Sequence, residues 1–120
     1  MNAHQQAYFR QKLEGWRSDL QREAQETLSN LASDSLHEAD VSDRASSESD
    51  WNVHLRTRDR QRKLLEKIDA ALRRLDADEY GYCVVTGDPI SLARLEARPT
   101  ATMSLEAQEA HERVEKVSRD

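Results

Sequence analysis

A chain of 120 residues with 37% hydrophobic, 34% charged and 5% aromatic residues has room for one domain, or for one small domain with an appendage. Its net charge of -5 at neutral pH argues against general nucleic-acid binding as the main activity. No apolar run approaches the roughly 20 residues of a membrane span, no signal-peptide core opens the chain, and the lone cysteine fits a reducing compartment, so we expect a soluble cytoplasmic protein.

Residues 1–32 are predicted to form the first helix. The apolar side chains of this segment recur at steps of three and four residues and therefore share one helix face; they are Phe9, Leu13, Trp16, Leu20, Ala24 and Leu31. Arginine, glutamine and acidic residues fill the positions between them, as expected for the faces that contact water.

Residues 33–50 interrupt the apolar pattern. Six acidic residues stand here against one arginine, with several serines between them. We interpret the segment as a polar turn in which one of residues 42–47 caps the next helix. Taken alone, the carboxylates of Asp40 and Asp43 are those of a solvated turn, or of a protruding tip that meets a basic channel or Mg²⁺.

Residues 51–79 are predicted to form a second helix. Its apolar face consists of Trp51, Leu55, Leu65, Ile68, Leu72 and Leu75, and its middle is strongly basic at Arg56, Arg58, Arg60, Arg62, Lys63 and Lys67. The basic run is either an exposed helix face or a binding patch, and an acidic protein surface suits it better than a nucleic acid. Two helices on the order of 40 Å long, joined by a polar turn, predict an antiparallel hairpin.

Residues 80–120 are predicted to form a small base that ends in a helix. The stretch from Tyr80 to Thr100 reads like half of a zinc finger, but Thr86 stands three residues after Cys83, where a second thiolate belongs. One cysteine cannot build a four-thiolate zinc site. The final helix is expected from Ser104, as its cap, to Val117.

A small apolar core is expected to hold this base together without metal. Its members are the large apolar side chains of the segment, namely Tyr80, Tyr82, Ile90, Leu92, Leu95, Met103 and Leu105. Cys83 is interpreted as a small, semi-buried residue beside the two tyrosines, with a redox sensor or a stray metal ligand as the alternatives.

Four separated motifs, in order, resemble the DksA family of bacterial regulators, which bind RNA polymerase through its secondary channel: DVSDRAS (40–46), LRTRDRQRKLLEKI (55–68), YGYC (80–83) and RLEARPTA (94–101). The resemblance implies a mainly α fold, with a long antiparallel coiled-coil hairpin, a small zinc-finger-like base and a C-terminal helix. Typical relatives carry Cys-x-x-Cys twice in the base. Here the four ligand positions read Cys83, Thr86, Ser104 and Ala107, which implies a zinc-independent member of the family.

The resemblance also implies roles for particular residues. The tip residues expected near the polymerase active centre are Asp40, Asp43 and Ala45. The residue expected to contact the rim of the channel is Arg60. The residues expected to bind the alarmone ppGpp together with polymerase are Leu64, Lys67 and Arg98. Gln108 stands where a lysine is typical, which weakens the attraction for an anionic ligand. Arg98 has a structural alternative, either an ion pair with Glu96 or a place at a helix end.

The expected function is therefore transcription regulation without enzymatic chemistry. A monomer binds polymerase, with no resident cofactor, no membrane and no sequence-specific DNA contact. It destabilises open complexes at ribosomal RNA promoters and activates some amino-acid biosynthesis promoters, with ppGpp as co-effector. Two other classes stay open: a Gre-like transcript-cleavage or channel-competing factor, whose tip has adjacent acids instead of Asp-x-x-Asp, and a structural coiled-coil adaptor that does not contact polymerase.

Overall fold

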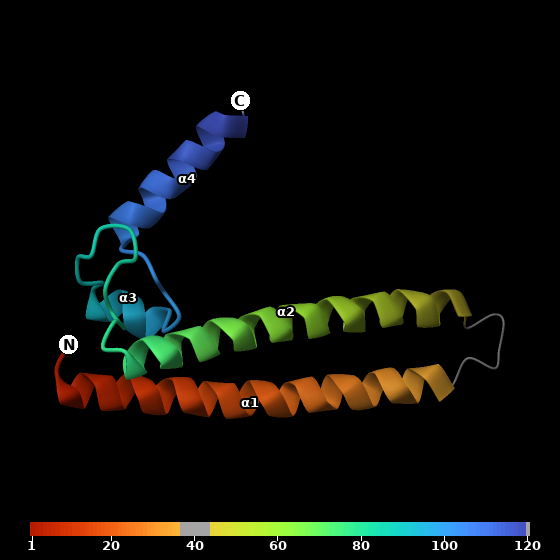
Figure 1. Ribbon diagram of the computed structural model, residues 1–120. Coiled ribbons are helices and arrows are strands. Elements are labelled where there is room, and N and C mark those ends of the chain that lie inside the picture. The colour runs from red at the N-terminus through yellow and green to blue at the C-terminus, as the bar shows by residue number, and fades with distance from the viewer. Residues whose placement is uncertain (37–43, 120) are drawn as a thin grey trace. The chain divides into compact units, whose positions relative to one another are not determined.

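The computed structural model describes residues 1–36 and 44–119, without the side chains of 34–36, 44–47 and 119. Within this part the chain forms α1 (Ala3–Leu36), α2 (Arg44–Asp76), α3 (Leu92–Ala97) and α4 (Leu105–Arg119) (Figure 1). The only strand-like pairing among these residues is a single bridge between Tyr82 and Pro89. The predicted mainly α fold is confirmed, and no described helix is long and apolar enough to cross a membrane.

Two compact units make up the chain. The base unit comprises Met1–Leu13 and Asp69–Asp120, and the arm unit comprises Glu14–Ile68. Both unit boundaries therefore fall inside the long helices α1 and α2. The predicted segments 1–32, 33–50, 51–79 and 80–120 follow the helices and turns along the chain and stay predictions. The two units instead group residues that pack together, so the first turns of α1 and the last turns of α2 belong with the residues that follow α2.

In the arm unit, α1 and α2 run antiparallel and side by side (Figure 1). α1 buries Leu20, Thr27 and Leu31. In α2, one series of positions shielded from solvent steps by three and four residues, as in a coiled-coil seam; it consists of His54, Thr57, Gln61, Leu64 and Ile68. Trp51, Asp59 and Leu65 are also partly shielded. The predicted apolar face of α2 was wrong at Leu55, which is 41% exposed. Its neighbour His54 occupies the seam instead, so polar residues line part of the arm.

The core of the base unit draws on every element of that unit. Its buried apolar residues are Phe9, Leu13, Ala71, Leu75, Tyr80, Cys83, Ile90, Leu95 and Ala107. Three expected core residues, Tyr80, Ile90 and Leu95, are confirmed, and Met103 is half-buried. The prediction was wrong for Tyr82, Leu92 and Leu105, which are 38%, 49% and 53% exposed.

Helix positions explain two of these differences. Leu92 and Leu105 each stand first in a helix, directly after a capping serine, where the side chain is covered only in part. Ser91 accepts a hydrogen bond from the backbone N–H of Arg94 at 3.2 Å, and Ser104 accepts one from that of Ala107 at 3.2 Å. The predicted cap at Ser104 is therefore confirmed, whereas α3, with only six residues, was not predicted.

Gly81 allows the close approach of two segments in the base. Its φ of 88° lies in the left-handed region. A Cβ atom at this position would stand 2.7 Å from Cε of Met1 and 3.6 Å from Cδ1 of Leu95. A larger residue would therefore strain the backbone and displace the flexible end of the Met1 side chain.

Candidate functional site

The structure does not describe the side chains of the residues predicted at the tip of the hairpin. Asp40 and Asp43 lie outside the described residues, and Ala45 lies in the first turn of α2, where side chains are not described. Their roles stay predictions from the resemblance.

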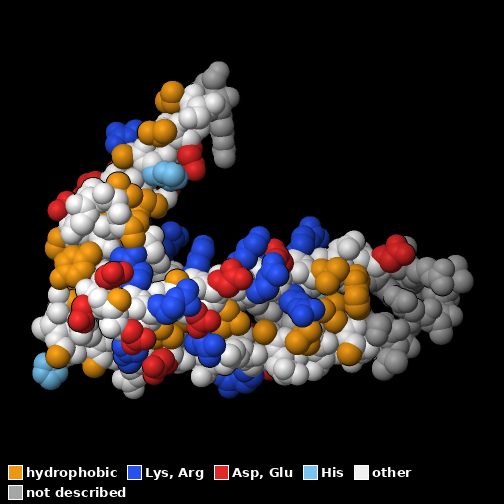
Figure 2. All heavy atoms as spheres, viewed as in Figure 1, with side chains coloured by type: hydrophobic (Ala, Val, Ile, Leu, Met, Phe, Trp, Pro, Cys, Tyr) orange, Lys and Arg blue, Asp and Glu red, His pale blue; other side chains and the backbone are white. Residues whose placement is uncertain are grey.

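The basic run of α2 is exposed along the arm unit, where Figure 2 shows a row of Lys and Arg side chains. Asp59 neutralises part of it. Its carboxylate lies 2.9 Å from Nζ of Lys63 and 2.8 Å from Nη2 of Arg62. The hydrogen bond from Lys63 is the main reason why the pKa of Asp59 falls below its usual range, so the pairs persist at neutral pH.

Two other cations of the basic run, Arg56 and Arg60, make no ion pair with Asp59. A groove in the arm is lined by Val53, Arg56, Asp59 and Arg60. Nη2 of Arg60 lies 3.3 Å from the Thr57 hydroxyl, and Nε of Arg56 lies 3.4 Å from the carbonyl of Asn52. Both arginines therefore line the same groove as Val53, an exposed apolar residue. Cations flanking an apolar patch suit a protein partner with acidic groups.

The predicted ppGpp residues are divided between the two units. Leu64, half-buried in the seam, and Lys67, exposed, belong to the arm unit, whereas Arg98 belongs to the base unit. Arg98 ends α3 as its C-cap, and its backbone N–H donates to the carbonyl of Arg94 at 2.8 Å. Of the two structural alternatives for Arg98, the helix end is confirmed; the Glu96 carboxylate instead pairs with Lys12 at 2.7 Å.

Gln108 is engaged within its own helix. Its Nε2 donates to Oε1 of Glu112 at 3.1 Å, one turn further along α4. The side chain is therefore neutral and already bonded, and it brings no cation to this end of α4.

The predicted zinc-ligand positions come together in the base unit. Cys83 is 3% exposed, and its thiol accepts hydrogen bonds from the Thr86 hydroxyl and from the backbone of Ser104, Thr86 and Val85. The bond from Thr86 is the main cause that lowers the pKa of Cys83 to about 6, and burial opposes it. The Cys83 sulfur is thus surrounded by hydroxyl and backbone N–H dipoles of the kind that surround a metal-bound thiolate.

These positions do not supply a donor set for structural zinc, which takes four sulfur or nitrogen ligands. The Thr86 hydroxyl accepts from the backbone N–H of Asp88 at 3.2 Å, and the Ser104 hydroxyl caps α4. Ala107 contributes a buried methyl group. Across residues 1–36 and 44–119 no cluster of three or more His, Cys, Asp or Glu could hold a metal ion.

Hydrogen bonds to backbone carbonyls hold the segment 99–104 in place. The buried hydroxyl of Tyr80 donates to the carbonyl of Pro99 at 2.7 Å, and Nε of Arg94 donates to that of Met103 at 2.9 Å. The N–H of Val84 donates to the carbonyl of Thr102 at 2.8 Å. These bonds satisfy polar groups of an irregular segment that packs on the core.

Arg74 holds a second irregular segment of the base, the one that directly follows α2. Its Nη2 donates to the carbonyls of Glu79 and Tyr82, at 3.1 and 2.7 Å. Sequence reasoning missed Arg74 and Arg94 as structural residues. An arginine in a charged helix is normally a surface residue, and nothing in the local pattern distinguishes one that reaches back to a loop.

Two family models match consecutive segments of the chain. Residues 5–75 match the family model "DnaK suppressor protein DksA, N-terminal domain", and residues 78–113 match "Prokaryotic dksA/traR C4-type zinc finger". The chain is 61% identical, over 100% of its length and 84% of the relative, to the "RNA polymerase-binding transcription factor DksA" of Caulobacter vibrioides. It is 40% identical to the Escherichia coli protein of the same name, over 88% of this chain and 70% of that one.

A solved structure agrees with the fold. "Transcription factor DksA2 from Pseudomonas aeruginosa" covers 96% of this chain and 88% of its own, with a TM-score of 0.91 and 41% identity. The match of residues 78–113 also corrects one expectation: the zinc-finger domain is detected, so the chain is not shown to be a paralogue that lacks it. The sequence differs from a C4-type finger in having one cysteine.

Proposed function

Because the chain belongs to the DksA family, we propose that it is a transcription regulator that binds bacterial RNA polymerase directly through the secondary channel. The observation that carries the proposal is the 61% identity, over the whole of this chain, to a relative named as an RNA polymerase-binding transcription factor. The exposed cations of α2, placed beside Val53, support a protein partner with an acidic surface. Such a partner places the activity in the bacterial cytoplasm.

The proposed mechanism needs no covalent chemistry. The arm enters the channel as a monomer, Arg60 contacts the rim, and the tip residues Asp40, Asp43 and Ala45 act near the catalytic centre. Carboxylates in that place alter the electrostatic environment of the metal-dependent centre and of the bound DNA. The result is a shorter-lived open complex at ribosomal RNA promoters and activation of some amino-acid biosynthesis promoters, without reading of DNA sequence.

The proposed co-effector is ppGpp, held between polymerase and the residues Leu64, Lys67 and Arg98. A guanidinium and an ammonium group suit a polyphosphate, since both remain charged at neutral pH. The neutral Gln108, bonded to Glu112, makes the expected response weaker than that of a relative with lysine there. The proposed activity is also independent of zinc, because the base holds one thiolate and uses the Ser104 hydroxyl as a helix cap.

The test is the lifetime of open complexes on a ribosomal RNA promoter. Purified polymerase is incubated with the wild-type chain, with Asp43→Asn, or with Asp50→Asn as a matched control on an exposed acid of α2. Wild type is expected to shorten the lifetime by about tenfold, equivalent to ~1.4 kcal/mol of barrier. Asp43→Asn is expected to lose this effect while its affinity for polymerase is unchanged, and Asp50→Asn to keep it.

Other outcomes identify the other classes. Tight binding without any change in lifetime, combined with cleavage of the transcript in stalled complexes, would indicate a Gre-like factor. Absence of binding to polymerase would indicate a structural adaptor and would overturn the proposal.

A further inference from the structure

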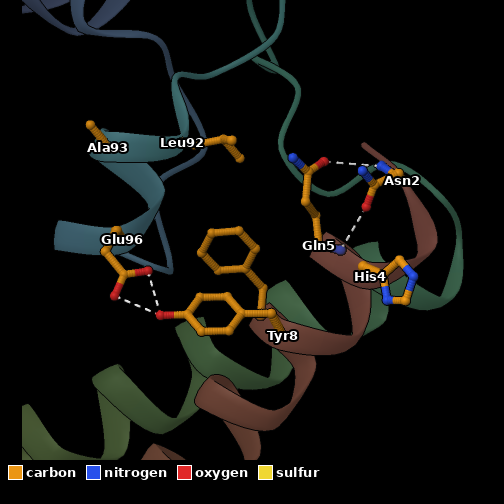
Figure 3. A pocket seen from close by; sticks show the side chains of 8 residues that line it. Asn2, His4, Gln5, Tyr8, Leu92, Ala93 and Glu96 are labelled. Atoms are coloured by element: carbon orange, nitrogen blue, oxygen red, sulfur yellow. Dashed lines mark hydrogen bonds between the residues drawn. The ribbon is translucent and has the colours of Figure 1, made fainter.

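A three-residue cluster on the base unit joins the first turns of α1 to the end of α3. Nζ of Lys12 lies 2.7 Å from Oε1 of Glu96 and 2.8 Å from the backbone carbonyl of the same residue. The hydroxyl of Tyr8 lies 2.7 Å from both carboxylate oxygens of Glu96, and Figure 3 shows it directed at that carboxylate. We call Tyr8, Lys12 and Glu96 the Glu96 clamp.

The electrostatics of the clamp keep its carboxylate ionised. The hydrogen bonds from Lys12 and Tyr8 are the main causes that lower the pKa of Glu96, and the same carboxylate raises the pKa of Tyr8. The ammonium of Lys12 also lies 5.9 Å from the centre of the Tyr8 ring, within the range of a cation–π contact. The charge of Glu96 is therefore compensated by groups on α1.

The residue that this arrangement affects is Arg98, two positions after Glu96. Two consecutive residue steps span at most about 7 Å between Cα atoms, so an unclamped Glu96 carboxylate is within reach of the long Arg98 side chain. The Arg98 side chain is exposed and makes no hydrogen bond or ion pair with the described residues, whereas the Glu96 carboxylate pairs with Lys12. Glu96, the acidic residue nearest to Arg98 in the sequence, is thus already bonded to Lys12 and Tyr8.

The backbone of Arg98 is fixed on both sides. Its N–H donates to the carbonyl of Arg94 at 2.8 Å, and its carbonyl accepts from the N–H of Ala101 at 3.0 Å. The next carbonyl, that of Pro99, accepts the buried Tyr80 hydroxyl at 2.7 Å. A fixed backbone removes the entropy cost of ordering this segment when Arg98 binds an anion, and an acid that is occupied elsewhere does not compete with that anion.

We propose that the Glu96 clamp is a positioning device for ligand binding: Lys12 and Tyr8 hold the Glu96 carboxylate away from Arg98 and so leave the guanidinium free for a polyphosphate. This inference rests on the proposed function, which assigns ppGpp to Arg98. It adds two residues of α1 that do not touch the ligand and that set the affinity through a competing acid on the chain itself.

The experiment uses the full chain, polymerase and ppGpp, and measures the ppGpp concentration that gives half of the maximal effect on open-complex lifetime. Lys12→Met is expected to raise this concentration by about threefold to fivefold, the effect of one exposed charge pair. The double variant Lys12→Met with Glu96→Gln is expected to restore the wild-type value, because the competing charge is gone. Affinity for polymerase without ppGpp is expected to stay constant throughout.

Arg10→Met is the matched control. Arg10 also lies on α1 and pairs with an acid of the base unit, Asp76, at the same N–O distance of 2.7 Å, and its exposure of 39% is close to the 32% of Lys12. Asp76 is distant from Arg98 in sequence, so loss of this pair is expected to leave the ppGpp response unchanged.

Different experimental results would refute different parts of the proposal. A wild-type ppGpp response in Arg98→Ala would refute the ligand site of the proposed function, and the inference with it. Loss in Arg98→Ala together with a normal response in Lys12→Met would refute the clamp alone. A weakened Lys12→Met that Glu96→Gln does not restore would show a merely structural role and would also refute it. In the free chain, the Nε–H resonance of Arg98 gives a separate readout: it is expected to shift in Lys12→Met and to return in the double variant.

Discussion

At the scale of single residues, the predicted ligand positions of the base have acquired other tasks. Ser104 caps α4, Thr86 donates to the Cys83 thiol, and Ala107 fills a place in the core. Cys83 retains the environment of a metal thiolate, since hydroxyl and backbone donors surround its sulfur. The Thr86 hydroxyl was visible in the sequence, but its contact with Cys83 depends on a turn whose geometry the sequence pattern does not specify.

The Cys83 thiolate makes stability depend on pH. Folding lowers the pKa of Cys83 from 9.0 to about 6, so between these values the unfolded chain binds more protons than the folded chain. The free energy of unfolding therefore gains from this group as pH rises; the gain is complete above pH 9.0 and is lost as pH falls through about 6.

Urea unfolding of wild type and of Cys83→Ala, followed across that pH range, checks the prediction. The stability difference in favour of wild type is expected to grow from pH 6 to pH 9. A difference that does not vary with pH would mean that Cys83 stays a thiol in the folded chain.

At the scale of the helices, hydrophobic periodicity predicted where α1 and α2 form but not the register of their seam. The leucine at position 55 suggested one face, whereas the seam passes through His54, Thr57 and Gln61. The residues C-terminal to Gln61 were predicted better, because Leu65, Ile68 and Leu75 are large and apolar and leave little choice of face. A polar seam cannot be located by searching for apolar spacing.

Gln61 is a position where the polar seam lowers stability. Its Oε1 is buried and has no hydrogen-bond partner among the described residues. An unsatisfied buried polar group costs about 1–3 kcal/mol, so Gln61→Leu is expected to raise the free energy of unfolding by about 1 kcal/mol or more.

Chemical denaturation followed by helical circular dichroism measures this change. Gln25→Leu, at an exposed position of α1, is the control and is expected to stay within about 0.5 kcal/mol of wild type. Destabilisation by Gln61→Leu would mean that the amide makes a bond on which the arm depends.

At the scale of the whole molecule, the fold class followed from composition and periodicity, and the family followed from four motifs that the comparisons support. The interactions that keep the base ordered could not be predicted in this way. They depend on Arg74, Arg94 and Tyr80, whose side chains bond to carbonyls between 5 and 19 residues away. Such pairs become visible only when the chain path is known, since no local pattern marks them.

Removal of metal ions tests whether the whole molecule is stable without zinc. Chelation of zinc is expected to leave the thermal unfolding midpoint of the wild-type chain unchanged, because the base holds a single thiolate. The variant with Thr86→Cys, Ser104→Cys and Ala107→Cys is expected to bind one zinc ion per chain and to lose stability on chelation. Stoichiometric zinc in the purified wild type would contradict the prediction.

The bonds that hold residues 99–104 have a kinetic consequence. A finger that closes around an ion completes its folding in a bimolecular step, at a rate that depends on how much free ion is present. Each bond described here joins two groups of one chain, from Tyr80 to Pro99 and from Arg94 to Met103. We therefore expect closure of this loop to be unimolecular, and a newly synthesised chain to complete it at a rate that does not depend on the concentration of free zinc.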